Sequence, residues 1–546
     1  MPQKSPFPAA PVNREPLHLK LLSVIGEAEP NKPALVSGEN QSSVLTYSAL
    51  SRQTRSVHAF LKARRFPRGG VVALVLHNCI EWPILCIGTW AAAGAISGAS
   101  ALFTDYELER QFADSACSVV VSDESHLEKV LRAAAKCARI QTIVCIREQS
   151  SRRALPANVV DWEDVLRQPP SSAFEQVDPE SIAILPYSSG TTGSPKGVML
   201  THRAFGTMMN VLKNHYEVVV GPHLKRPIRL SEEKYMLNLP FYHIYGFGVL
   251  NMALLSGATG IVMRAFEPAL YCSIIQEYKV RLLMLVPPIL IFLTKNQLAS
   301  KYDLTSLEFI LVGAAPSGRD ICEEFLQKHP SVQILAQGYG MTECGMASHL
   351  ADAEFKDPYA FIGRPASNFE QKVIDVTTGK ELPRGERGEL CIRSPTLMQG
   401  YLNRPEATAE TIDNEGWLHT GDVAYVDDLG RAYIVDRMKE LIKVKGLQVA
   451  PAEMDDLLLS HPSIRDAAVI GIPDKNRGEL VRAYVVRGSD SLTEKHVADF
   501  VASKVSVYKH LTGGVHFIDE IPKSAAGKIL RRELRDRVAK EAKAKL

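Results

Sequence analysis

The chain has 546 residues, 46% of them hydrophobic and 23% charged, which is the composition of an ordinary globular protein. Its 63 Lys and Arg and 61 Asp and Glu residues give a formal charge of +2, which argues against a nucleic-acid-binding surface. A chain of this length is expected to form two or more domains. Nine scattered cysteines without a C-x-x-C pair fit a reducing compartment and no structural metal site.

The N-terminal part of the chain predicts neither a secretion signal nor a membrane anchor. Residues 1–16 are Pro-rich and lack the continuous apolar core of a secretory signal. Residues 82–103 form an uncharged stretch that is long enough to span a bilayer. However, Pro83, several Gly, Ser and Thr residues and a polar flank favour a buried helix followed by a buried strand. We therefore expect no transmembrane segment.

Apolar strands alternate with amphipathic helices along most of the chain, which predicts an α/β fold of packed sheets. Ligands gather at the carboxyl ends of parallel strands. Loops that are rich in Gly or polar residues follow three of the strands, from residue 187 onward and at 312–318 and 337–345, so we expect them to converge on one crevice. The representative strands are expected at residues 71–76, 118–123, 142–146, 282–287, 309–315 and 332–340.

The segment 187–202, YSSGTTGSPKGVMLTH, lies between a short apolar strand at 182–185 and an amphipathic helical pattern. We interpret it as a loop that joins a strand directly to a helix. Its glycines let backbone amides approach a ligand, and its hydroxyls and Lys196 donate to phosphate oxygens, so a polyphosphate is the expected ligand. Pro195 and Gly197 flank the lysine, unlike the Walker pattern, which disfavours a P-loop NTPase. A flexible Gly/Ser connector is the weaker alternative.

The residue pattern of the sequence changes near residue 430, where charged residues begin to surround short apolar pairs. We expect a second, small α+β domain beyond this point. The predicted domains are 1–436 and 437–546. The second should contain a helix that begins at Pro451, strands at 467–472 and 482–486, a helix with a capping box from Ser491 to Glu494, and a strand near 515–519. Basic residues beside Gly446 indicate a second anion contact, and a solvated linker is the alternative.

The chain ends in Ala-Lys-Leu, a conservative relative of the Ser-Lys-Leu peroxisomal signal. This tail predicts import into peroxisomes, with the import receptor as a partner. A chance match in a tail rich in Lys and Ala is the alternative.

Six motifs occur in the order and spacing of the adenylate-forming superfamily: YSSGTTGSPKG, LPFYHIYG, QGYGMTE, GWLHTGD, YIVDRMKELIKVKGLQVAPAE and PKSAAGKILRR. The chain most resembles the branch of 4-coumarate-CoA ligases, acyl-CoA synthetases and firefly-type luciferases, from residue 45 to Lys528. The resemblance implies a large N-terminal domain of packed α/β sheets and a small, mobile α+β C-terminal domain. It also implies a carboxylic acid, Mg²⁺, ATP and coenzyme A as reactants, an acyl-adenylate intermediate and a thioester product.

The resemblance also assigns roles in the two half-reactions. Lys528 would serve adenylation together with Thr342 at the α-phosphate, and Glu343 would hold Mg²⁺. The small domain would rotate at Lys439 and present Lys445 and Gly446 to coenzyme A. The residues implied to bind ATP or AMP are Ser188, Ser189, Gly190, Thr191, Thr192, Lys196, Gln337, Gly338, Tyr339, Thr342, Asp422, Arg437, Lys443 and Gln448.

The acid pocket implied by the resemblance contains His243, Tyr245, Gly313, Ala314 and Met346. We assign His243 a positioning role within the catalytic set, because an ionised carboxylate needs no general base.

After MTE, the plant ligases typically continue with Ala-Gly-Pro-Val, whereas this chain continues with Cys-Gly-Met-Ala-Ser at 344–348. The difference favours an apolar fatty or aryl-alkanoic acid over 4-coumarate. The alternatives are a 4-coumarate-CoA ligase, a luciferase-like monooxygenase and an inactive binding module.

Overall fold

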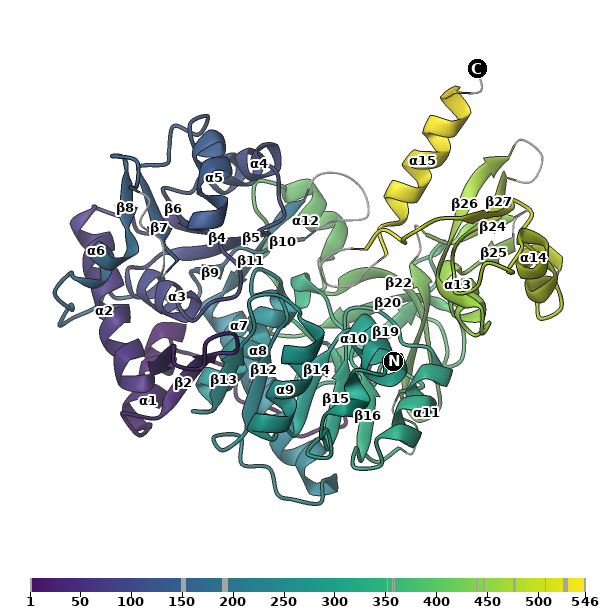
Figure 1. Cartoon of the computed structure of the whole chain (residues 1–546), viewed down its shortest axis with the longest axis horizontal. Coiled ribbons are helices and arrows are strands. Elements are labelled where there is room, and N and C mark those ends of the chain that lie inside the picture. Colours follow the sequence, from purple (N-terminus) through teal and green to yellow (C-terminus); the bar gives the residue numbers. More distant parts are fainter. Residues whose placement is uncertain are drawn as a thin grey trace.

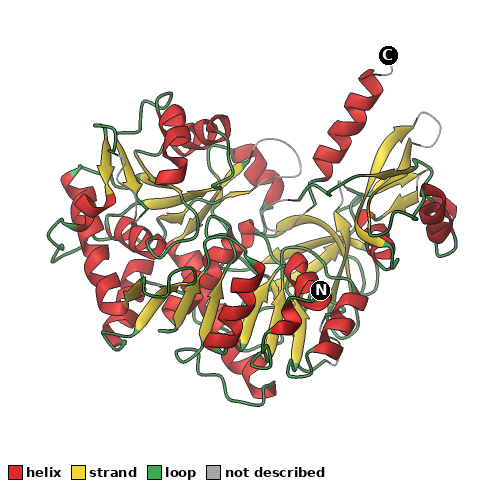
Figure 2. Ribbon diagram, in the orientation of Figure 1, coloured by secondary structure: helices red, strands yellow, loops and turns green. Residues whose placement is uncertain are grey.

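The computed structural model consists of a large α/β body and a smaller α+β domain (Figure 1). It describes residues 2–148, 154–188, 195–350, 352–355, 357, 359–437, 440–444, 447–474, 478–505, 507–523 and 529–544. The predicted fold class is therefore confirmed. Several stacked groups of strands are flanked by helices in the large body, and the helix nearest the C-terminus projects from the smaller domain (Figure 2).

The first sheet has nine strands, in the order β10-β11-β9-β5-β4-β6-β7-β8, with β21 paired to β11. The central strands β4 and β5 are buried along their whole length, as expected for parallel strands covered on both faces. Its strands are β4 Val71–Val75, β5 Ala95–Ala99, β6 Val119–Asp123, β7 Thr142–Ile146, β8 Val159–Asp161, β9 Ile182–Ile184, β10 Tyr187–Ser188, β11 Lys196–Thr201 and β21 Gly400–Tyr401. The helices of this part are α1 Leu17–Glu27, α2 Tyr47–Ala63, α3 Trp82–Ala91, α4 Asp105–Ser115, α5 Leu127–Ala134, α6 Trp162–Leu166 and α7 His202–Asn214.

The apolar stretch at 82–103 forms the buried helix α3 followed by the buried strand β5, as predicted. Within the described ranges, no helix combines the length and the hydropathy that a bilayer span requires.

Two further, mostly parallel sheets and an antiparallel strand pair belong to the body. One sheet has the order β12-β13-β2-β3, and the other has the order β14-β15-β16. The strands are β2 Pro33–Ser37, β3 Val44–Thr46, β12 Lys234–Leu237, β13 Thr259–Val262, β14 Leu282–Leu285, β15 Phe309–Val312, β16 Ile334–Gln337, and the pair β17 His349–Leu350 and β18 Arg364–Pro365. The helices are α8 Ile244–Leu255, α9 Pro268–Tyr278, α10 Pro287–Lys295 and α11 Arg319–Lys328.

A five-stranded antiparallel sheet leads from the body to the small domain. Its order is β1-β19-β20-β22-β23, with bounds β1 Gln3–Lys4, β19 Glu370–Ile374, β20 Gly388–Arg393, β22 Leu418–Val426 and β23 Ala432–Arg437; α12 spans Pro405–Thr411. The small domain has its own sheet, ordered β25-β24-β27-β26 with β28 beside β27. Its elements are β24 Ile442–Val444, β25 Leu447–Val449, α13 Pro451–Leu459, β26 Ile464–Asp474, β27 Gly478–Arg487, α14 Glu494–Ala502, β28 Val515–Phe517 and α15 Arg531–Ala544. The expected boundary between 436 and 437 stays a prediction.

Two local predictions were wrong. The phosphate-loop segment does not run directly into a helix: strand β11 intervenes and pairs with β10, and α7 begins only at His202. The reason is that Val198 and Leu200 are buried in the sheet, so the apolar run after Lys196 has strand periodicity. The capping box from Ser491 to Glu494 is also absent, because Thr493 caps α14 by accepting from the His496 amide at 3.2 Å.

Candidate active site

The carboxylate of Glu343 is the centre of the phosphate end of the site. Glu343 lies in a short 3₁₀ turn after β16 and is only 6% exposed. Its Oε1 accepts hydrogen bonds from the Ser188 hydroxyl at 3.1 Å and from the Tyr401 hydroxyl at 2.8 Å. Burial and the charge of Glu343 raise the pKa of Tyr401, so this phenol keeps its proton and donates it. The carboxylate is thus oriented by two hydroxyls from different strands.

Lys196 is positioned beside the same group. It pairs with Ser188 across the β10–β11 ladder, and its ammonium nitrogen lies 4.8 Å from the centre of the Tyr401 ring. A cation over an aromatic face is stabilised by the ring quadrupole. Tyr401 therefore contacts a cation through its ring and a carboxylate through its hydroxyl, at the base of the predicted phosphate loop. Ser189, Gly190, Thr191 and Thr192 of that loop lie outside the described residues.

The donor set around Glu343 fits a hard divalent cation. Among the residues that the structure describes, no hydrogen bond or ion pair engages its second oxygen, Oε2. A carboxylate oxygen of this kind suits Mg²⁺, which usually keeps several waters and also binds substrate phosphates. The Mg²⁺ role of Glu343 stays a prediction that this geometry supports.

The QGYG segment follows β16 at the carboxyl edge of its sheet and is held by contacts to two other loops. The amide of Gln337 accepts from the Ser317 N–H at 2.9 Å through Oε1 and donates to the Tyr359 carbonyl through Nε2. The Gly338 N–H donates to the Val312 carbonyl at 2.9 Å. A side chain at Gly340 would lie 1.9 Å from the Met346 carbonyl oxygen, so only glycine fits. The polar loops after β15 and β16 therefore meet, as predicted.

Asp422 lies where the resemblance implies a ribose contact. It is 6% exposed in β22, and its Oδ2 accepts from the Tyr339 hydroxyl at 2.5 Å. Its backbone N–H donates to Thr420 Oγ1 at 3.1 Å. Arg437 is its direct partner across the β22–β23 ladder. These contacts join the QGYG loop to the strand pair that precedes the small domain.

The remaining nucleotide candidates are only partly described. Thr342 begins the 3₁₀ turn that carries Glu343. The β24–β25 register pairs Lys443 with Gln448. The side chains of Arg437, Lys443 and Gln448 lie outside the described part of the chain, as do all of Lys439, Lys445, Gly446 and Lys528. Their functional roles stay predictions.

His243 begins helix α8 and caps it. Its Nδ1 accepts the Tyr245 backbone N–H at 3.2 Å, so the proton of the neutral imidazole is on Nε2. A ring of this tautomer presents a donor through Nε2. This geometry supports the predicted role of His243 in orienting a carboxylate, and it is unsuited to removing a proton through Nδ1.

The predicted acid pocket has an aromatic wall that packs closely on glycine. A Cβ at Gly313 would lie 2.9 Å from Cε1 of Tyr245, whose hydroxyl donates to the Leu311 carbonyl at 3.2 Å. Burial raises the pKa of Tyr245, so it stays neutral. A Cβ at Gly248 would lie 2.1 Å from the Met346 sulfur. Ala314 has a left-handed backbone, with φ of 71°. The structure thus places Tyr245 on Gly313 and Met346 on Gly248.

Sequence reasoning missed Tyr401 as a site residue. It reaches Glu343 across 58 residues of chain and belongs to a two-residue strand. No spacing rule connects the two positions, and Gly400-Tyr401 alone has the character of a turn. Only the pairing of β21 with β11 brings this hydroxyl to the phosphate loop.

His349 supports Tyr339 of the QGYG loop and yields a prediction on pH. It is fully buried, exchanges both backbone hydrogen bonds with Tyr339, and its ring bonds Gln371 at 2.8 Å and Ser348 at 3.0 Å. Burial lowers its pKa to about 4. Below pH 6.5 the unfolded chain therefore takes up a proton at this histidine that the folded chain does not. The free energy of unfolding consequently falls as the pH drops towards 4. This group lowers it by about 3 kcal/mol at most.

His349→Gln should make the thermal unfolding midpoint fall less steeply between pH 7 and pH 4 than in the parent chain, because glutamine cannot be protonated. His496→Gln, at an exposed histidine of α14, is the matched control and should keep the parent slope. Equal slopes for His349→Gln and the parent would contradict this assignment.

The fold and the site together define a two-domain, nucleotide-binding α/β enzyme. The chain matches the AMP-binding enzyme family over residues 24–402 and the C-terminal domain of AMP-binding enzymes over residues 453–528. It therefore belongs to the AMP-binding enzyme family, within the adenylate-forming superfamily.

Named relatives and solved structures agree with this placement. The chain is 39% identical to 4-coumarate-CoA ligase 2 of Nicotiana tabacum over 536 residues, which cover 96% of this chain and 95% of that protein. The anthranilate CoA ligase AuaEII in complex with anthranoyl-AMP has a TM-score of 0.86 at 25% identity, covering 98% of this chain and 99% of its own. ATP-bound MatB from Rhodopseudomonas palustris shares the fold, with a TM-score of 0.84 at 24% identity and coverage of 96% and 99%.

Proposed function

We propose that this chain joins an apolar fatty or aryl-alkanoic acid to coenzyme A through an acyl-adenylate. It is an ATP-dependent, AMP-forming acid-CoA ligase, in keeping with its family and its CoA-ligase relatives. The observation that carries the site is the cluster of Ser188, Lys196, Glu343 and Tyr401 at the phosphate loop.

In the first step, a carboxylate oxygen of the acid attacks the α-phosphorus of ATP, and pyrophosphate leaves with the bonding electron pair. Two anions must meet, so catalysis depends on positioning and on cations placed where charge develops. Lys196 supplies one such charge, and Glu343 is oriented to hold the Mg²⁺ that accompanies ATP. Asp422, oriented by Tyr339, accepts from the ribose hydroxyls, while His243 donates from Nε2 to the acid. In the second step, the thiol sulfur of coenzyme A attacks the acyl carbon, and AMP leaves.

The wall formed by Tyr245 on Gly313 and Met346 on Gly248 supports an apolar acid as the substrate. A flexible thioether and an aromatic ring can line either an alkyl chain or an aryl ring. The high similarity to 4-coumarate-CoA ligases keeps 4-coumarate itself as the second candidate.

The test is mass spectrometry of products formed from Mg-ATP and a panel of short, medium, long and aryl acids, including 4-coumarate, with and without coenzyme A. We expect a thioester that depends on coenzyme A and forms best with an apolar acid. Adenylates without any thioester would instead support a luciferase-like reaction, which oxygen uptake and light emission with an adenylated luciferin would reveal. No AMP from any acid would support an inactive relative.

The location that we propose is the peroxisome, on the basis of the tail Ala-Lys-Leu and its recognition by an import receptor. Deletion of Leu546, which lies outside the described residues, should move a protein tagged at its N-terminus from puncta to the cytosol. Lys540→Ala, outside the tripeptide, is the control and should remain punctate. Unchanged puncta after deletion of Leu546 would refute the signal.

A further inference from the structure

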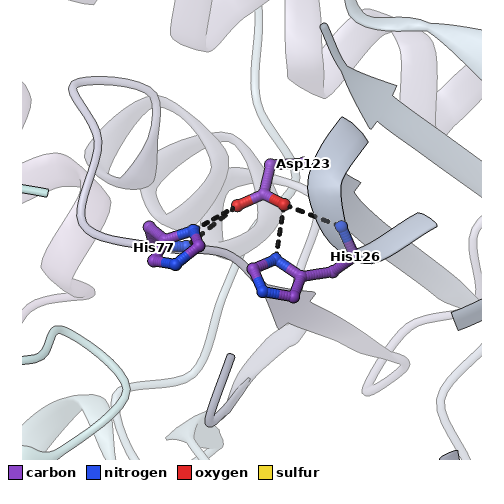
Figure 3. Close-up of side chains that lie close together, drawn as sticks. All are labelled: His77, Asp123 and His126. Carbon is purple, nitrogen blue, oxygen red and sulfur yellow. Dashed lines mark hydrogen bonds and ion pairs between the residues drawn. The ribbon is translucent and has the colours of Figure 1, made fainter. Parts of the chain in front are cut away.

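Two imidazoles and a carboxylate, from His77, Asp123 and His126, lie close together (Figure 3). His77 follows β4, Asp123 ends β6, and His126 ends the 3₁₀ turn after β6. Because β4 and β6 are adjacent parallel strands, their carboxyl ends bring the three side chains to one sheet edge. No residue assigned above to ATP, coenzyme A or the acid belongs to this cluster.

Each imidazole ring faces the Asp123 carboxylate through its own Nδ1 atom, and the two rings lie at different carboxylate oxygens. His77 Nδ1 lies 2.9 Å from Asp123 Oδ2, and His126 Nδ1 lies 2.5 Å from Asp123 Oδ1. The ring centres are 4.5 Å apart, and one potential ligand atom from each residue lies within 4.8 Å of the other two. The side chains are 29%, 15% and 12% exposed for His77, Asp123 and His126, so an ion can reach them from solvent.

Asp123 is preorganised as an anion. Its Oδ2 accepts from the backbone N–H of His77 and its Oδ1 from that of His126, both at 3.2 Å, and Ser125 donates a hydroxyl hydrogen bond at 2.7 Å. These three hydrogen bonds fix the position of the carboxylate before any ion arrives.

The side chain of Arg264 is a cation that lies close to the His77–Asp123–His126 cluster. The Arg264 guanidinium lies 3.4 Å from His77 Nδ1 and 3.5 Å from the Ser125 hydroxyl. It also forms an ion pair of 3.4 Å with Glu148 and is 43% exposed. An exposed arginine with a carboxylate partner of its own can turn away when a stronger cation binds, at a modest cost.

We propose that His77, Asp123 and His126 bind a divalent transition-metal ion of the Zn²⁺ class. Neutral imidazole nitrogen and carboxylate oxygen are ligands of Zn²⁺, Co²⁺, Ni²⁺ and Cu²⁺, whereas Mg²⁺ prefers oxygen alone. The ion would replace the proton that each Nδ1 shares with Asp123, so that each neutral imidazole carries its proton on Nε2 and offers the Nδ1 lone pair. One carboxylate oxygen would complete a set of three. Water would occupy the open fourth position.

The ion would stabilise the segment around His77 and Asn78, which contacts the loop leading to the acid site. Asn78, next to His77, donates its side-chain amide to the Leu239 carbonyl at 2.9 Å and accepts the Phe241 N–H at 2.9 Å. These two residues belong to the loop that ends at His243, the cap of α8. A metal held by His77 therefore stabilises the backbone beside the acid-positioning loop.

A second cluster with potential metal ligands, Glu389, Cys391 and His419, is a weaker candidate. Burial raises the pKa of Cys391, so its sulfur stays a protonated thiol. His419 already bonds Glu389 at 2.9 Å and lies 3.6 Å from Asp413. It also lies in β22 close to Asp422, so this cluster belongs to the framework of the nucleotide site.

The test is metal binding to the full chain, stripped with a chelator and kept in excess Mg²⁺ to occupy the phosphate site. Zn²⁺ titration should show one saturable site whose affinity falls by at least about 10²-fold in His126→Gln and in His77→Gln, because each loses a ligand. His496→Gln should bind like the parent chain. Zn²⁺ should also raise the thermal unfolding midpoint of the parent but not of the two variants.

Co²⁺ gives a readout that needs no variant. Its visible absorption bands should report nitrogen and oxygen ligation in the unmodified chain, and Zn²⁺ should abolish them by competition. Equal Zn²⁺ affinity in the parent and in a folded His126→Gln or His77→Gln variant would overturn the proposal. The proposal would also be overturned if the parent chain showed neither saturable Zn²⁺ binding nor Co²⁺ absorption bands, regardless of the results with the variants.

Discussion

Glu343→Gln is expected to slow acyl-adenylate formation by about 10²- to 10³-fold, the range observed when a group that stabilises charge in a transition state is removed. The substitution keeps the shape of the side chain and an oxygen that can accept from Ser188 and Tyr401. It removes the negative charge that would hold Mg²⁺ against the phosphates. The measurement is exchange of labelled pyrophosphate into ATP at increasing Mg²⁺ concentrations.

Higher Mg²⁺ should recover part of the activity of Glu343→Gln if metal affinity is what was lost. Tyr401→Phe is the matched companion, because it removes one hydrogen bond to Glu343 and leaves the carboxylate charge. We expect the rate of acyl-adenylate formation to fall about tenfold, which is the order of magnitude for the loss of one hydrogen bond to a charged group. Activity of Glu343→Gln equal to that of the parent at low Mg²⁺ would exclude a metal role for this carboxylate.

Lys528→Ala is expected to reduce adenylation by about 10²-fold or more, as for a lost charge contact in the transition state, while thioester formation from supplied acyl-adenylate continues. The resemblance implies that this lysine serves only the first half-reaction. The two half-reactions are measured separately, as pyrophosphate release and as acyl-CoA formation from synthetic adenylate.

The control for Lys528→Ala is Lys523→Ala. Lys523 lies five positions earlier and pairs with Asp466 at 2.7 Å, so its removal tests the general loss of a lysine from this part of the small domain. Lys523→Ala should leave both half-reactions near the parent rate. If Lys528→Ala slows both half-reactions equally, the result would argue against the assignment of each half-reaction to a different arrangement of the two domains.

Several features could be predicted from the sequence because their causes are local. Uninterrupted apolar runs such as residues 71–76 and 119–121 become buried parallel strands, since only a strand covered on both faces can be apolar at every position. The resemblance also assigned Lys196, Glu343 and Asp422 to one nucleotide site; in the structure Lys196 begins β11, Glu343 lies in the 3₁₀ turn after β16, and Asp422 lies within β22.

Other features depend on contacts that no local pattern contains. Strand β11 lies between the phosphate loop and α7 because Val198 and Leu200 find partners in the sheet, so the periodicity of that short run became clear only in its packing. Thr493 caps α14 in place of Ser491, because α14 begins at Glu494 and the Thr493 hydroxyl is the one that reaches the His496 N–H.

The sequence by itself thus determined the fold class, the family and the residues at the mouth of the phosphate loop, because those rest on apolar periodicity and on short motifs. Tertiary structure alone decided which side chains orient these groups: Tyr401 donates to Glu343, Tyr339 donates to Asp422, and His77 lies against Asp123. The physical reason is distance along the chain, since hydrogen bonds between side chains 46 to 83 residues apart form only after the sheets have assembled.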